Sequence, residues 1–497
     1  MENKEKRTAK RPGLFLAVLP LVFMFVVLFT GLIIFDIDIK ILLLICAAFT
    51  TCLCMYLGHT WKAIEEEIVS KLAKGFPAIM ILICVGLMIG AWIVSGTIPF
   101  LVYLGLEIIS PKFIILTSFL VTVILSVSTG TSWGAAGTVG AALISVASGM
   151  GAPLPAVAGA IVAGAYFGDK MSPLSDSTNM SAIATGTNLY QHVGHMFYTT
   201  VPGFIICCIV YTAAGMSFAG SGEVSQVDEI IKTLSELFNM SMPAGFVLLI
   251  PPIIVIIGSL WKKPTIPVML ISSAVAIIIA VTMQGFSFST CATSMVDGFS
   301  MEMFGNTSVN LDTIAEQIPA LLERGGMASM MNTTLMAFCG FSFIGALTVS
   351  GSLDVVLERV MKHIHSTGQL ITITVIMGVL MITVIGEATV TFLMIGGMFR
   401  GEYIKRGLES KNLSRTLEDS VTVIEPLVPW SLAGVYMTSV LGVPTIQYAP
   451  WACLCYTGII FAVIYGFTGF GIARIKEGSD SYNEYLELNG KKEIVQE

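Results

Sequence analysis

Charged residues are scarce in this chain. Only 12% of its 497 residues are Asp, Glu, Lys or Arg, whereas 55% are hydrophobic. This balance leaves no soluble domain of useful size and indicates a polytopic helical membrane protein. Basic stripes with interleaved aromatic residues are also missing, which argues against nucleic acid as a partner.

Metal-binding cysteine patterns are missing as well. The ten cysteines are scattered through apolar runs, and none belongs to a CxxC motif or a Cys/His cluster. We therefore interpret them as small hydrophobic residues rather than metal ligands or disulfide partners, and we expect no bound cofactor.

Polar segments are few and short. The longest are the first dozen residues, 217–241, about 285–324 and the last two dozen residues. None has the apolar periodicity of a core, so we expect tails and loops. The apolar run after the basic start MENKEKRTAKRPG is too long for a signal peptide and lacks a cleavage motif, so it predicts a first membrane span.

Long apolar runs are abundant, and they occur in two similar sets. GAWIVSG at Gly90–Gly96 recurs as GALTVSG at Gly345–Gly351, and Gly130 corresponds to Gly386 at an offset near 250 residues. An internal duplication explains this pattern. The predicted units are a cytoplasmic basic tail (1–12), a first membrane repeat (13–216), an external connector (217–242), a second membrane repeat (243–473, with an insertion at about 303–327) and a cytoplasmic tail (474–497).

Lysine and arginine placement predicts opposite orientations for the two copies. The basic N-terminus and the loop with Lys62, Lys71 and Lys74 are expected inside, whereas the acidic connector is expected outside. Basic loops of the second copy, including Lys405–Arg415, are then inside if that copy enters from the outside. Both termini would be cytoplasmic, in a bacterial-type cytoplasmic membrane.

Some runs, notably 134–150 and 387–399, are shorter than the roughly 20 residues that cross a bilayer. They predict half-helices or re-entrant hairpins. The expected fold is therefore an all-α polytopic membrane protein with roughly 10–14 membrane segments, two inverted-topology repeats and discontinuous helices, an architecture of secondary transporters.

Two pairs of polar, interrupted segments occupy corresponding positions in the copies. STGTSWG at Ser128–Gly134 corresponds to IGEAT at Ile385–Thr389, and GDKMSPLSDST corresponds to LEDSVTVIEPLVPW at Leu417–Trp430. Such pairs indicate substrate and ion sites near the membrane midplane. Close helix packing is the alternative explanation for the small residues, but it explains Thr131 and Ser132 less well.

The densest polar stretch is Gly168–Asn179, directly after an uncharged apolar run. Pro173 cannot continue a helix, so the preceding helix should stop near Ser172 and free backbone carbonyls beside Asp169 and Asp176. Oxygen ligands of this kind suit a small hard cation. A polar loop outside the bilayer that caps two helices is the alternative.

Asp169 and Asp176 are seven residues apart. Two carboxylates in a poorly hydrated pocket cannot both stay ionised cheaply, so the pair can hold either a proton or a transient sodium ion. This competition is a minimal mechanism for exchange. Lys170 is either a counter-charge in the empty site or a snorkelling residue at the inner interface.

Other ionisable candidates have two interpretations each. Glu387 is the only charge between Lys362 and Arg400, and it is either functional or bonded to backbone amides at a helix break. Asp419 corresponds to Asp169, whereas the neighbouring Glu418 can simply pair with Arg415 at the inner surface. Interfacial anchoring is expected for His192 and His195, with pH sensing as the alternative.

The motifs TGTSWG, GDKMSPLSDSTN, LSRTLEDS and PLVPW together resemble the NhaC family of sodium/proton antiporters, which also includes malate/lactate exchangers. The resemblance extends from about Pro12 to Arg474. It implies that the ion site includes residues of both copies: Asp169, Ser172, Ser175, Asp176 and Asn179, with Glu418, Asp419 and Thr422.

We therefore expect a secondary antiporter, not an enzyme, that exchanges sodium ions for protons by competition at a midplane carboxylate site with alternating access. One alternative is a sodium-linked malate/lactate–proton exchanger, with Thr131, Ser132 and Arg415 receiving the carboxylate. A remote alternative is an intramembrane aspartyl protease using Asp169 and Asp176, although both lie in one broken stretch. The expected partners are sodium, protons and the lipid bilayer, and for the alternative function also lactate or malate. A homodimer is one of the oligomeric states that the sequence leaves open.

Overall fold

The computed structural model describes residues 10–490 except 36, 174, 219–224, 242–243, 262, 306–316, 324, 362–363, 365 and 480. The predicted tail 1–12, the connector, the insertion and the final tail lie partly outside the described residues. Within them the chain is helical, and its one β-bridge joins Leu408 to Arg474.

The helices of the first half and the connector are α1 (Leu14–Phe29), α2 (Ile39–Tyr56), α3 (Trp61–Val94), α4 (Thr97–Ile108), α5 (Ile114–Thr129), α6 (Ser132–Ala135), α7 (Ala141–Gly149), α8 (Leu154–Met171), α9 (Asp176–Thr185), α10 (Leu189–Phe218) and α11 (Ser225–Leu237).

Those of the second half are α12 (Ile250–Leu260), α13 (Thr265–Ile279), α14 (Phe288–Asp297), α15 (Gln317–Leu322), α16 (Met331–Ser350), α17 (Ser352–Met361), α18 (Thr367–Ile385), α19 (Ala388–Lys405), α20 (Ser410–Leu417), α21 (Leu432–Leu441), α22 (Thr445–Tyr448), α23 (Cys453–Thr468) and α24 (Tyr482–Leu488).

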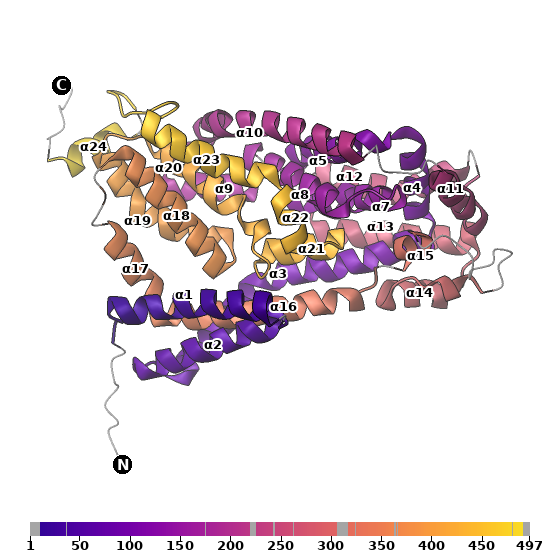
Figure 1. Ribbon diagram of the computed structural model, residues 1–497, viewed down its shortest axis with the longest axis horizontal. Helices are drawn as coiled ribbons and strands as arrows, with labels where there is room; N and C mark the ends of the chain where they lie inside the picture. Colours follow the sequence, from indigo (N-terminus) through magenta and orange to yellow (C-terminus); the bar gives the residue numbers. More distant parts are fainter. Residues whose placement is uncertain are drawn as a thin grey trace, which may run out of the picture.

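The polytopic membrane character predicted from composition is confirmed. Six helical segments among the described residues are long and apolar enough to cross a membrane, or up to eight if each sharply bent pair is one span. Shorter apolar helices account for further predicted segments. Several long helices, including α3, α10 and α16, run along the long axis of the molecule, with α24 at one end and α11 at the other (Figure 1).

Glycines end helices at matching places in the two halves. Gly130 ends α5 and Gly386 ends α18, and both have left-handed backbone conformations, with φ of 72° and 67°. A residue without Cβ adopts this conformation at little cost, so glycine suits a sharp helix end. A new helix starts directly afterwards in both halves, which is compatible with the proposed duplication.

The connector, expected to be a loop without apolar periodicity, contains the helix α11. Its Ile230 and Leu234 are buried, and they are four residues apart, so they share one helix face. The helix packs against α4. A short apolar stripe in a largely polar segment therefore sufficed for a packed helix.

Small residues let α8 approach its neighbours closely. The helix packs along α5, and a Cβ added to Gly164 would lie 2.6 Å from the Phe119 carbonyl oxygen. Ser126 of α5 also donates a hydrogen bond to the Ala165 carbonyl oxygen at 2.5 Å. This packing fixes the end of α8, where the dense polar stretch begins.

Candidate functional site

The first helix break lies where proline predicted it. α8 ends at Met171, and α9 begins at Asp176. The side-chain amide of Asn179 donates to the carbonyl oxygens of Pro173 at 3.1 Å and Ser175 at 2.7 Å, which closes the turn. Ser172 donates to the Val127 carbonyl oxygen at 3.1 Å and is buried, so the break packs inside the protein.

Asp169 is half-buried at the end of α8, and hydroxyl groups surround its carboxylate. Ser132 donates to Oδ2 at 3.0 Å, and Ser175 donates to Oδ1. Thr178 donates to the Asp169 backbone carbonyl at 2.7 Å. The two polar segments of the first copy, STGTSWG and GDKMSPLSDST, therefore meet at one carboxylate, although Ser132 and Asp169 lie 37 residues apart.

Lys170 joins this break to the second half of the chain. Its ammonium group forms an ion pair with Oδ1 of Asp419, and the two side chains are 1% and 0% exposed. Thr199 of α10 donates to the same oxygen at 3.1 Å. Lys170 is thus a buried counter-charge rather than a snorkelling residue, and removing either partner would leave an uncompensated buried charge.

The second helix break is a π-helical turn, Glu418–Thr422, that follows α20. Both carboxylate oxygens of Glu418, Oδ2 of Asp419 and the Thr422 hydroxyl are buried, and within the described residues none makes a hydrogen bond of normal geometry. Buried polar atoms almost always have partners. Inserted π turns are frequent at functional sites, and these oxygens are suitable ligands for a proton or a hard cation.

Charges from both halves influence one another here. Glu418 lies within electrostatic range of Asp169, Lys170 and Asp419. The alternative in which Glu418 simply pairs with Arg415 at the inner surface does not match the structure, since both are fully buried and no ion pair joins them among the described residues. The arrangement is a cluster of three carboxylates and one ammonium group, in which Glu418, Asp419 and Lys170 are buried and Asp169 is half-buried.

Asp176 lies apart from this cluster. It is the exposed first residue of α9, where the positive end of the helix dipole favours a negative charge. It is within electrostatic range of Asp169. The predicted Asp169 and Asp176 pair is therefore not a shared hydrogen-bonded site, but the two charges still interact.

Thr131 and Glu387 occupy matching positions as helix caps. The Thr131 hydroxyl accepts from the Gly134 amide at 3.2 Å. Glu387 accepts from the amides of Thr389 at 2.9 Å and Val390 at 2.8 Å. Of the two interpretations of Glu387, the structure supports a carboxylate bonded to the backbone amides at a helix start.

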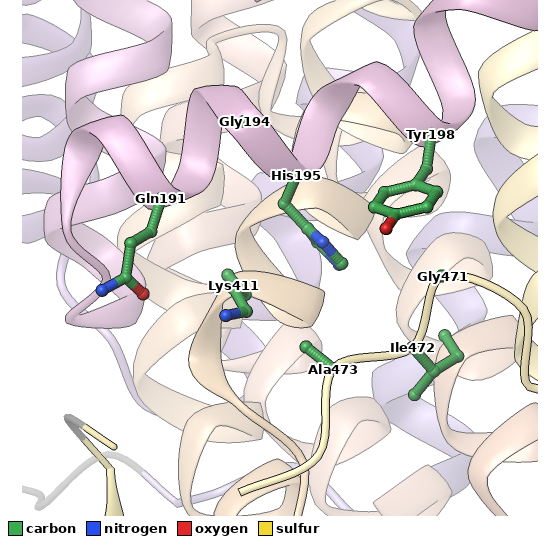
Figure 2. Close-up of a pocket in the computed structure, with 8 residues that line it drawn as sticks. All are labelled: Gln191, Gly194, His195, Tyr198, Lys411, Gly471, Ile472 and Ala473. Atoms are coloured by element: carbon green, nitrogen blue, oxygen red, sulfur yellow. The ribbon is translucent and has the colours of Figure 1, made fainter. Parts of the chain in front are cut away.

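The histidines are buried, so interfacial anchoring was the wrong expectation. A ring nitrogen of His192 lies 2.8 Å from the Ser414 hydroxyl, and one of His195 lies 3.2 Å from Oδ1 of Asn412. Both contacts join α10 to α20, because α10 packs along that helix. His195 also lines an open cavity (Figure 2).

Sequence reasoning missed Thr199, the hydroxyl donor to Asp419. Its signal was a pair of threonines next to Pro202 in an otherwise apolar run. A threonine in such a run usually bonds to its own helix, so only the packing of α10 against the second break shows its role.

The fold and these contacts define a class of protein. Discontinuous membrane helices with buried carboxylates, hydroxyls and a counter-charge at their breaks are the hallmark of a secondary ion transporter.

Comparison with known proteins gives the family. The profile described as the Na+/H+ antiporter family matches residues 164–470. The chain is 46% identical to an uncharacterized Na+/H+ antiporter of Haemophilus influenzae, over 95% of this chain and all of that protein. It is 33% identical to the Na+/H+ antiporter NhaC of Alkalihalophilus pseudofirmus, over 91% of this chain and 95% of that protein. It is 34% identical to the Malate-2H+/Na+-lactate antiporter of Bacillus subtilis, over 87% of this chain and 90% of that protein.

The chain therefore belongs to the Na+/H+ antiporter family, as the motif resemblance predicted. Its relatives are transporters, so the protein is a transporter rather than an enzyme, and the aspartyl protease hypothesis is discarded.

Proposed function

We propose that this protein exchanges sodium ions for protons across the cytoplasmic membrane, with the two ions competing for the cluster of Asp169, Glu418, Asp419 and Lys170. The observation that carries this proposal is the set of buried carboxylate oxygens without hydrogen-bond partners beside a buried ion pair. A proton or a sodium ion can neutralise such oxygens, but both cannot occupy them at once.

The individual groups then have distinct roles. Asp169, with the Ser132 and Ser175 hydroxyls, supplies sodium ligands from the first repeat, and Asn179 and Ser172 hold the break in shape. Glu418, Asp419 and Thr422 supply ligands from the second. The Lys170 ammonium group neutralises Asp419 when no cation is bound, and it must move away from Asp419 when sodium binds.

Asp176 acts at longer range in this proposal. Its exposed carboxylate adds negative potential near Asp169, which raises the local sodium concentration without direct coordination. Thr131 and Glu387 set the start of the helices that pack around the cluster.

Alternating access is attributed to the two repeats, oppositely oriented in the membrane, with both termini cytoplasmic. This rests on the lysine and arginine distribution and on the matching helix breaks. Single cysteines placed in 225–237 and 406–411, in a cysteine-depleted chain, test it with an impermeant thiol reagent. Labelling from opposite sides is expected, and labelling of both from one side would refute the inverted repeat.

The main test reconstitutes the protein into liposomes and follows lumenal pH after a sodium pulse. Sodium-dependent proton movement without any organic acid is expected. Its absence in well-inserted protein would refute sodium–proton exchange.

A second candidate is an exchange that also carries an organic acid. It is favoured by the 34% identity to the relative named Malate-2H+/Na+-lactate antiporter. Of the three side chains predicted to receive the carboxylate, Thr131 caps a helix with its hydroxyl and Ser132 donates its hydroxyl to Asp169. Arg415 is the remaining one. Uptake of labelled malate or lactate into the same liposomes separates the two candidates.

A further inference from the structure

Arg415 is a fully buried arginine of α20, and only one end of its guanidinium group has a partner. Nη1 donates to the carbonyl oxygen of Gly471 at 2.8 Å, which ties α20 to the segment after α23. Nε and Nη2 are buried and have no hydrogen-bond partner within the described residues. Burying a charged group without a partner is costly, so this donor edge requires an explanation.

The open cavity of about 450 Å³ beside α10 does not supply that explanation. Gly471 and Tyr198 belong to its wall, whereas Arg415 is not among the described residues that line it (Figure 2). A ligand in the cavity would not contact the unpartnered edge unless the wall moved. We therefore looked for a partner of Arg415 inside the protein.

Asp419 is the charged group that interacts most strongly with this guanidinium. It follows Arg415 by four residues, a spacing that puts both side chains on the same side of a helix. Oδ1 of Asp419 accepts from Lys170 and Thr199, whereas Oδ2 is buried and has no hydrogen-bond partner in the described part of the chain. A donor edge and an acceptor oxygen, both without partners, thus lie about one helical turn apart.

The packing of α23 limits what can bind Oδ1 of Asp419. A Cβ added to Gly458 would lie 2.7 Å from this oxygen and 3.3 Å from Nζ of Lys170, so the backbone of α23 covers the ion pair closely. Oδ1 therefore has room for one cation at a time, either the Lys170 ammonium group or a sodium ion. Oδ2 is left for a second donor.

We propose that Arg415 is a positioning residue for sodium binding: when Lys170 moves away from Asp419, the Nε and Nη2 edge of Arg415 donates to Oδ2 and holds Oδ1 in place for the sodium ion. The inference rests on the sodium–proton exchange proposed above. Arg415 then pairs with a buried carboxylate that would otherwise lose its counter-charge. The bond to Gly471 fixes the guanidinium plane, and the rigid donor directions of arginine suit this role better than a flexible ammonium group.

The test separates this role from a purely structural one. Purified full-length protein is titrated with sodium at constant ionic strength, with choline as the replacing cation and no organic acid. The rise of the thermal unfolding midpoint gives the sodium affinity, because a ligand of the folded state stabilises it. Arg415→Lys keeps the charge but loses the planar edge, so the affinity should fall about tenfold, and Arg415→Gln should lower it further.

A role confined to the Gly471 contact gives a different result. It would lower the unfolding midpoint without sodium and leave the sodium affinity unchanged in both variants, and this outcome would overturn the proposal. If Arg415→Gln does not fold, Arg415→Lys decides alone, because it retains the buried positive charge.

Arg400 of α19 provides the matched control. It also has a buried Nε without a partner among the described residues, and its Nη2 pairs with Glu484 of α24 at 2.6 Å. Arg400→Lys should bind sodium as the unchanged protein does. A loss of affinity in this control as large as in Arg415→Lys would also overturn the assignment.

The sodium-pulse assay on the unchanged protein is a separate measurement. Absence of exchange in that assay refutes the proposed function. Exchange in the unchanged protein, together with normal sodium affinity in the Arg415 variants, refutes only the role of Arg415.

Discussion

The two helix breaks occupy positions that correspond in the proposed duplication, yet their acidic groups have different hydrogen-bond partners. At the first break, Ser132 and Ser175 donate to both oxygens of Asp169. At the second, neither Glu418 nor Oδ2 of Asp419 accepts a hydrogen bond of normal geometry among the described residues, and the Thr422 hydroxyl is the group placed to donate to Glu418. The first break therefore has a carboxylate whose two oxygens both accept hydrogen bonds, whereas the second has buried carboxylate oxygens that lack such bonds among the described residues.

This difference suggests a division of labour. A carboxylate already held by hydroxyls keeps its charge more readily and suits direct cation binding, whereas buried carboxylates without donors favour protonation. The ion pair of Lys170 with Asp419 connects the two breaks, so a change of charge at one break alters the electrostatic energy of the other.

The largest effect is expected when this connection is broken. Lys170→Gln or Asp419→Asn leaves a buried charge without its partner, so each should destabilise the protein by about 3–5 kcal/mol and abolish exchange. The double variant should regain much of the stability but not the exchange. Thermal unfolding in detergent and the sodium-pulse assay measure both, and single variants as stable as the unchanged protein would contradict the buried pair.

Asp169→Asn and Asp176→Asn compare the half-buried and the exposed carboxylate of the first break. The amide preserves shape but cannot titrate, so Asp169→Asn should abolish sodium-dependent proton movement. Asp176→Asn should retain part of it, because an exposed charge acts only through its screened field. Equal and complete loss in both would instead support the pair predicted from sequence.

The hydroxyl donors should have a smaller effect. Ser132→Ala or Ser175→Ala removes one charge-assisted hydrogen bond from Asp169, so the apparent sodium affinity should change about tenfold while exchange persists. Ser128→Ala is the matched control, since this nearby serine bonds only to the Ile124 carbonyl oxygen of its own helix. If Ser128→Ala changed the apparent sodium affinity as much as Ser175→Ala does, the effect would not be specific to Asp169.

The mildest perturbation is pH itself. As pH falls, protons occupy the carboxylates and exclude sodium, so the apparent sodium affinity should weaken about tenfold per pH unit below the apparent pKa of the site and become constant above it. His192→Gln and His195→Gln should leave this slope unchanged, because competition needs no separate sensor. A sodium affinity that stays flat with pH in proteoliposomes would count against competition.

Local rules allowed part of this molecule to be predicted. Apolar runs indicated membrane helices, because backbone amides in lipid can hydrogen-bond only within the protein. Pro173 predicted the end of α8, because proline cannot continue a helix. The polar stretch Gly168–Asn179 and the motif resemblance located the candidate site. These features depend on neighbours in sequence, so the sequence by itself determined them.

Only the tertiary structure decided which charges meet. Lys170 and Asp419 are 249 residues apart, and Thr199 reaches Asp419 because α10 packs along α20, the helix that leads into the second break. Neither composition nor spacing could place Asp176 on the surface, or Glu418 and Arg415 in the interior. Burial and pairing of charges depend on which helices pack together, because desolvation and Coulomb energies are set by distance in space rather than by order along the chain.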